Sequence, residues 1–204
     1  MKISKRLFST TLLMVITCII SSCGDDDIEI ETETNISYTL TISPDLLKFV
    51  TPQVSYVDEN GNLVTLTGVE DLDGKVIGDS SWTSIVISGT GYKCWTMQMK
   101  FKHLGFHSHM TVKYLRNDFV EDTAGKVYNF HHDVFTSIKA KKITKSSKGL
   151  DSVSYSDSHM SITLVDYHYG DNIETYLKSL YDTPDRVGYY INENGDVNRK
   201  DEFE

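Results

Sequence analysis

Apolar and polar positions alternate along most of the chain from residue 36 onward. The clearest run is 95–102, where Trp95, Met97, Met99 and Phe101 alternate with polar side chains. Residues 106–114 repeat the pattern. Successive side chains of a strand point to opposite faces, so this pattern predicts strands with one face against a core and one in water. Such half-buried strands are typical of antiparallel sheets.

Turn signals divide the chain into short extended segments. Asn60-Gly61 and Asn194-Gly195 each lie between two such segments, and Asn-Gly is the strongest short-range signal for a β-hairpin. These features predict a mainly β protein, an antiparallel β-sandwich of Ig-like or transthyretin-like type, with a β-barrel as the alternative. The expected strands are 36–42, 47–57, 63–67, 84–88, 95–102, 106–114, 127–140, 161–169, 188–192 and 197–200.

One helix is expected near the C-terminus. Asp171 and Glu174 have the spacing of a capping box, and Ile173, Leu177 and Leu180 fall on one helical stripe. Pro184 ends the helix. The basic, serine-containing stretch 141–151 predicts a loop, and so do the acidic residues around 71–74.

The first residues predict export. A basic start at 1–6 precedes an apolar run over 7–20, which has the length of a signal peptide and is too short to span a bilayer comfortably. The run ends in Ile20-Ser21-Ser22-Cys23, which resembles the lipobox of bacterial lipoproteins. That resemblance implies cleavage before Cys23 and attachment of lipid to it, so that the membrane is a partner through the lipid anchor.

An acidic cluster follows the cysteine. Gly24, Asp25, Asp26 and Asp27 resemble the surface-export signal of Bacteroidetes lipoproteins, which implies an outer-membrane protein facing the cell exterior. A solvated tether explains the same residues, and the two interpretations are compatible. The expected organisation is a signal peptide over 1–22, an acidic tether over 23–35 and one β-sandwich domain over 36–204.

Charge restricts the partners. The formal net charge is −9, and it becomes −12 without residues 1–22, which contain three basic residues and no acidic one. Such an acidic chain argues against binding nucleic acid, whose phosphates require a positive field. It also argues against lying flat on an anionic membrane.

Histidine and cysteine side chains are candidates for metal binding and for nucleophilic chemistry, and the sequence favours neither role. His107 and His109 share one strand face with metal-ligand spacing, but a site needs three or four convergent ligands. We therefore interpret them as exposed strand histidines and expect no cofactor. Cys94 is the one thiol left after processing, and we interpret it as a small buried or half-buried apolar residue.

No hydrolase, nucleotide-binding or zinc-protease motif is present in the sequence, so we expect a non-enzymatic protein. Trp82 and Tyr92 are the candidate ligand platform, because aromatic rings can stack on sugars. Core packing is the alternative for such rings, and Trp95 is expected in the core.

Residues 36–62 resemble the opening of small, uncharacterised outer-surface lipoproteins of gut Bacteroidetes. The resemblance implies no activity. We expect a surface-anchored binding module for a glycan or for a partner protein of an outer-membrane complex. The alternatives are a structural or adhesin-like accessory subunit of a surface assembly, and an enzyme with an unrecognised site.

Overall fold

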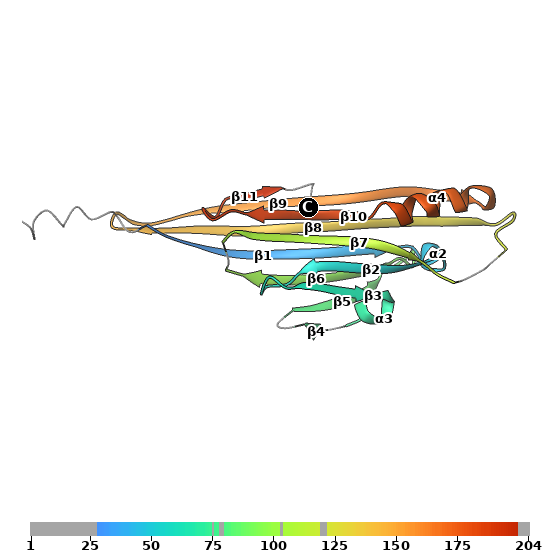
Figure 1. Cartoon of the computed structure of the whole chain (residues 1–204), viewed down its shortest axis with the longest axis horizontal. Helices are drawn as coiled ribbons and strands as arrows, with labels where there is room; N and C mark the ends of the chain where they lie inside the picture. Colours follow the sequence, from blue (N-terminus) through green and yellow to red (C-terminus); the bar gives the residue numbers. More distant parts are fainter. Residues whose placement is uncertain (1–27, 75, 78–79, 103, 119–121, 200–204) are drawn as a thin grey trace, which may run out of the picture.

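A computed structural model describes residues 28–74, 76–77, 80–102, 104–118 and 122–199. The expected signal peptide, the lipidation site Cys23 and the export signal Gly24 to Asp27 lie outside the described residues. Within them, the expectation of a mainly β fold is confirmed. The chain forms two antiparallel sheets that face each other as a β-sandwich (Figure 1).

Sheet A has six strands, in the order β4 (Val76–Ile77), β5 (Ser80–Val86), β6 (Lys93–Phe101), β1 (Glu29–Ile42), β8 (Val127–Ser146) and β9 (Gly149–Tyr169). Sheet B has five strands, in the order β11 (Val197–Arg199), β10 (Asp185–Ile191), β7 (Phe106–Arg116), β2 (Val50–Val57) and β3 (Leu63–Thr67).

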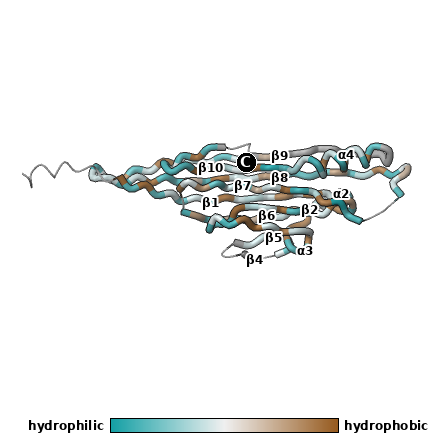
Figure 2. Tube along the Cα trace, in the orientation of Figure 1, coloured by the Kyte–Doolittle hydropathy of each residue, from teal (hydrophilic) through white to brown (hydrophobic). Residues whose placement is uncertain are grey.

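The alternating residues build the core. Trp95, with the expected inner face of β6, is buried, as is the inner face of β7 from Phe106 to Tyr114. The polar end of the Trp95 ring is satisfied, because its Nε1 donates a hydrogen bond to Asp73 Oδ1 at 2.7 Å. Apolar and polar positions follow one another along the strands in Figure 2. Burial of one strand face therefore holds the two sheets together.

The helices are short. The expected C-terminal helix is confirmed as α4 (Gly170–Asp182), whose Ile173, Leu177 and Leu180 are buried. Glu174 pairs with Arg116 of β7, and the side chain of Asp171 lies outside the described residues. The other helices are α2 (Pro44–Leu47) and α3 (Gly68–Leu72), and α3 replaces part of the loop expected near residue 71. Within the described ranges, no helix is long and apolar enough to cross a membrane.

Two expectations about irregular segments are wrong. Strand β1 begins at Glu29, inside the expected tether, and β8 and β9 continue through 141–151, where a loop was expected. The two segments pair with each other, since Glu29 lies opposite Lys145 and Ile30 opposite Thr144. Lys145 Nζ lies 2.6 Å from Glu31 Oε1 and 3.5 Å from Glu29 Oε2. Opposite charges on paired strands therefore stabilise segments that look mobile when each is considered alone.

These residues form an arm, defined here as β1 up to Glu33 with the β8–β9 hairpin from 141 to 154. In Figure 1 the arm tapers to the end of the molecule where β1 begins. The tip of the β10–β11 hairpin packs at its base: a Cβ on Gly195 would meet Thr32 Cγ2 at 2.9 Å, and Gly195 has a φ of +76°. Only glycine fits this position well. Both expected Asn-Gly hairpins are thus confirmed.

Candidate functional site

Trp82 does not form part of a ligand platform, and that expectation is wrong. Its side chain is fully buried on the inner face of β5, with its ring 5.8 Å from the ring of Tyr56 at an interplanar angle of 67°. Residues 78–81, Gly-Asp-Ser-Ser, are typical of a loop, and this loop-like sequence before Trp82 suggested that its ring is exposed. However, Trp82 lies opposite Met97 and so shares the inward face of β6. Strand register, which is not local information, decides its position.

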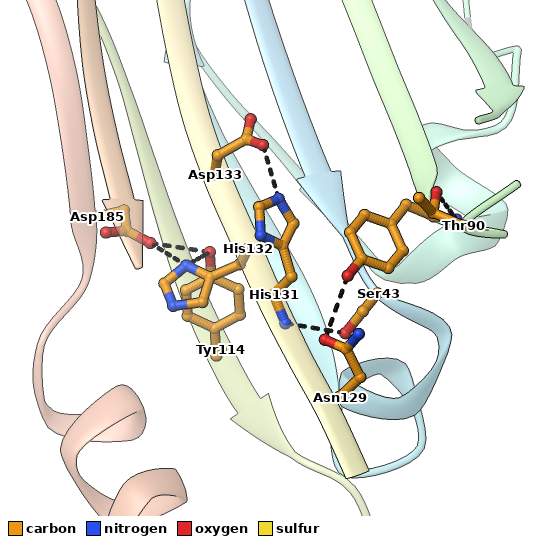
Figure 3. Close-up of polar contacts among 9 residues, drawn as sticks. Ser43, Thr90, Tyr114, Asn129, His131, His132, Asp133 and Asp185 are labelled. Atoms are coloured by element: carbon orange, nitrogen blue, oxygen red, sulfur yellow. Dashed lines mark hydrogen bonds and ion pairs between the residues drawn. The ribbon is translucent and has the colours of Figure 1, made fainter. Parts of the chain in front are cut away.

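Tyr92 lies on the outer side of sheet A, away from Trp82. Its ring stacks on His131 with centroids 4.9 Å apart and an angle of 20° between the rings. Its hydroxyl donates to Asn129 Oδ1 at 3.2 Å, and His131 Nε2 lies 3.0 Å from Asp133 Oδ2 (Figure 3). One face of the tyrosine ring is therefore already covered by a neighbour. The two predicted platform residues are not brought together.

His107 and His109 share the outer face of β7, as predicted. His107 packs against Tyr190, with ring centroids 4.4 Å apart. Burial lowers the pKa of His109, and the nearby His107 and Arg186 lower it further. Within the described residues, no group of three or more histidine, cysteine or acidic side chains could hold a metal ion. Cys94, on the outer side of β6, is a half-buried free thiol.

A largely buried polar cluster links the two sheets around Asp185 at the start of β10. Its Oδ2 accepts a hydrogen bond from the Tyr114 hydroxyl at 2.8 Å and lies 2.9 Å from His132 Nδ1 (Figure 3). Its Oδ1 accepts from the Ser161 hydroxyl at 2.7 Å. The four side chains come from β7, β8, β9 and β10. The cluster therefore ties both strands of the long hairpin to sheet B.

Electrostatics in this cluster favour a charged Asp185. Burial alone would raise the pKa of Asp185, but its interactions with His132 and with the hydroxyls of Ser161 and Tyr114 outweigh the effect of burial. The net pKa is below its ordinary value. Conversely, burial and the adjacent Asp185 carboxylate raise the pKa of Tyr114 well above the usual range. The phenol therefore stays neutral and donates a hydrogen bond to the carboxylate.

The cluster has the residue types of a hydrolytic triad but not its arrangement. In such a triad serine donates to histidine, which is oriented by the acid. Here Ser161 donates directly to the carboxylate of Asp185. The geometry supports a structural role, in which the cluster holds the two sheets together. The sequence did not predict this cluster, because its members are far apart in the chain.

The outer face of sheet A carries a polar surface that the sequence did not predict. The register places Asn35 of β1 between Lys100 of β6 and Lys139 of β8. The next row along the strands places Ser37 between Gln98 and Ser137. These six residues line a hollow of about 640 Å³, together with Ile36, Met99 and, from the β2–β3 hairpin, Glu59.

Two smaller hollows adjoin the first and share Asn35 with it. One, of about 310 Å³, is lined by Glu33, Lys100 and Lys102 among others. The other, of about 460 Å³, extends over the base of the arm to Ser154 and Ser156 of β9. We call the surface formed by the three hollows the polar groove. It runs across β6, β1, β8 and β9.

The groove combines hydroxyl, amide and ammonium groups. Its four lysines, Lys100, Lys102, Lys139 and Lys141, form no ion pair within the described part of the chain. By contrast, Lys145 at the end of β8 is held between two glutamates. The groove therefore presents ammonium donors that no carboxylate of the described residues occupies. Comparisons of the chain with protein-family models, curated proteins and solved structures gave no match.

Proposed function

We propose that this chain is a non-enzymatic binding protein, anchored by lipid at Cys23 to the outer face of the outer membrane, and that its polar groove binds a glycan. The observation that carries the proposal is the groove itself, a polar surface hollowed to about 640 Å³ at its centre and continued on both sides. A sugar chain presents hydroxyls on all sides, so it needs a surface with many hydrogen-bond donors and acceptors.

The position of the groove on rigid strands supports the proposal. Asn35, Ser37 and Ser137 belong to two central strands of sheet A, whose inner sides are fixed by the buried core. Side chains held in this way lose little freedom when a ligand binds. Several weak hydrogen bonds can therefore contribute to affinity together.

The arm supports the proposed orientation. The described chain begins next to β1, whose start lies at the tip of the arm (Figure 1). An anchor a few residues upstream would place the tip of the arm toward the membrane and the sandwich beyond it. A binding surface on the sandwich then lies away from the lipid, where an extracellular polymer has access.

A tryptophan placed in the groove tests the proposal. Ser137→Trp should fill the central hollow and weaken binding of fluorescent glycans to cells expressing the full chain by about tenfold or more, a loss of about 1.4 kcal/mol. Ser55→Trp is the matched control, since Ser55 is also a half-buried outer-face strand serine, but on sheet B. Cys23→Ser should remove the protein and the signal from the cells while purified protein keeps binding. A broad glycan panel without any ligand would overturn the proposal.

Binding of a partner protein is the second candidate, and the length of β9 favours it. This strand of 21 residues forms an edge of sheet A, and Leu150 and Val153 on it are 71% and 61% exposed. A long exposed edge can pair with a strand of another chain. A protein that co-purifies with the full chain, in the absence of any glycan ligand, would favour this function.

A further inference from the structure

We propose that the polar groove selects acidic glycans, sugar chains that carry carboxylate or sulfate groups; this inference rests on the proposed function. It is carried by the four lysines of the groove, which form no ion pair with any residue that the structure describes. Lys100 and Lys139 flank Asn35 in one row of the sheet, and Lys141 follows Lys139 on the same face of β8. Lys102 follows directly after β6.

The local charge differs in sign from that of the whole chain. The chain has 20 basic and 29 acidic residues. In the groove, by contrast, four lysines meet two acids, Glu33 and Glu59, so the local balance is positive. A positive hollow in an acidic protein attracts an anion to one place and repels it elsewhere. This contrast favours selective rather than diffuse binding of a polyanion.

The spacing of the lysines suits a polymer rather than a single small anion. Lys100 and Lys139 are two strands apart, which corresponds to roughly 10 Å between their Cα atoms. Lys139 and Lys141 are two residues apart on β8, or about 7 Å. Charges spread over such distances can each meet a different group along an extended chain. The hydroxyls and amides between them can bind the sugar hydroxyls.

A pair of polymers that differ only in charge tests the inference. Binding of the purified full chain to polygalacturonate should be strong in low salt, whereas fully methyl-esterified polygalacturonate, which has the same backbone without charge, should bind at least about tenfold more weakly. Raising the salt from about 0.05 to 0.5 M should weaken only the first interaction, because salt screens exposed charges. Chondroitin and chondroitin sulfate, compared in the same way, separate carboxylate from sulfate recognition.

Lysine variants locate the effect. The double variant Lys100→Gln, Lys139→Gln should lower affinity for the acidic polymer by about tenfold or more. Lys113 is exposed on the outer face of β7 in sheet B and forms no ion pair among the residues that the structure describes. Lys113→Gln is therefore the matched control and should bind normally.

The outcomes separate this inference from the proposed function. Equal binding of charged and esterified polymers, with loss in Ser137→Trp, would overturn acidic selectivity and leave glycan binding in place. An equal loss in the control and in the double variant would show diffuse charge attraction and would also overturn the inference. Absence of binding to every acidic and neutral glycan would overturn both.

Discussion

Replacing Trp82 with alanine is expected to lower the free energy of unfolding by about 3–5 kcal/mol. The indole is fully buried between the sheets, and truncating a large buried side chain loses its transfer free energy and leaves a cavity. Urea unfolding followed by far-UV circular dichroism measures the loss. Because the effect arises in the core, any loss of glycan binding should follow the fraction of unfolded protein.

Tyr92→Ala is the control for this prediction. The Tyr92 residue is half-buried on the outer side of sheet A, where its ring stacks on His131. We expect a smaller cost of about 1 kcal/mol. A Trp82→Ala protein of unchanged stability that lost binding would instead support the ligand platform that the sequence suggested.

Asp185→Asn is expected to lower the free energy of unfolding by about 3 kcal/mol at neutral pH. The carboxylate accepts hydrogen bonds from Tyr114 and Ser161 and pairs with His132. Removing one partner of such a buried group leaves the others imperfectly satisfied. Asp196→Asn is the control, because the ion pair between Lys142 and Asp196 is exposed to solvent and should contribute little to stability.

The pH dependence gives this prediction a second readout. The pKa of Asp185 is lowered in the folded chain, below the ordinary 3.8. Its contribution to stability is therefore present above about pH 4 and is lost as the pH falls through the lowered folded value. The difference in stability between wild type and Asp185→Asn should shrink in that acidic range. A difference that stays constant down to pH 2 would contradict the assigned role of the carboxylate.

The alternation of side chains allowed most of the fold to be predicted. Trp95 and its neighbours on β6 had to face a core, whatever the topology, because burial selects one face of a strand. The segments around Glu31 and Lys145 could not be predicted, because each looks like a solvated charged stretch until the other is placed beside it. Charge complementarity between distant segments has no local signature.

The sites were harder to predict for the same reason. His132 could have been recognised as inward-facing, since it is separated from Val134 and Ile138 on β8 by an even number of residues and so lies on the same face. Its partners Tyr114 and Asp185, however, lie far away in the sequence. Likewise, Lys100 and Lys139 become neighbours only through the pairing of β6 and β8 with β1. Trp82 shows a different error. The loop-like residues before it suggested exposure, whereas its position in β5 opposite Met97 places it on the inward face.

Lysine footprinting tests the central claim, that the outer face of sheet A is the binding surface, most directly. The purified chain is treated with an acetylating reagent with and without its glycan ligand, and the modification of each lysine is measured by mass spectrometry. The account predicts protection of Lys100, Lys139 and Lys141 by the ligand, with Lys113 of β7 and Lys178 of α4 modified as before. Unchanged modification of the groove lysines in the presence of saturating ligand, or protection confined to sheet B, would contradict it.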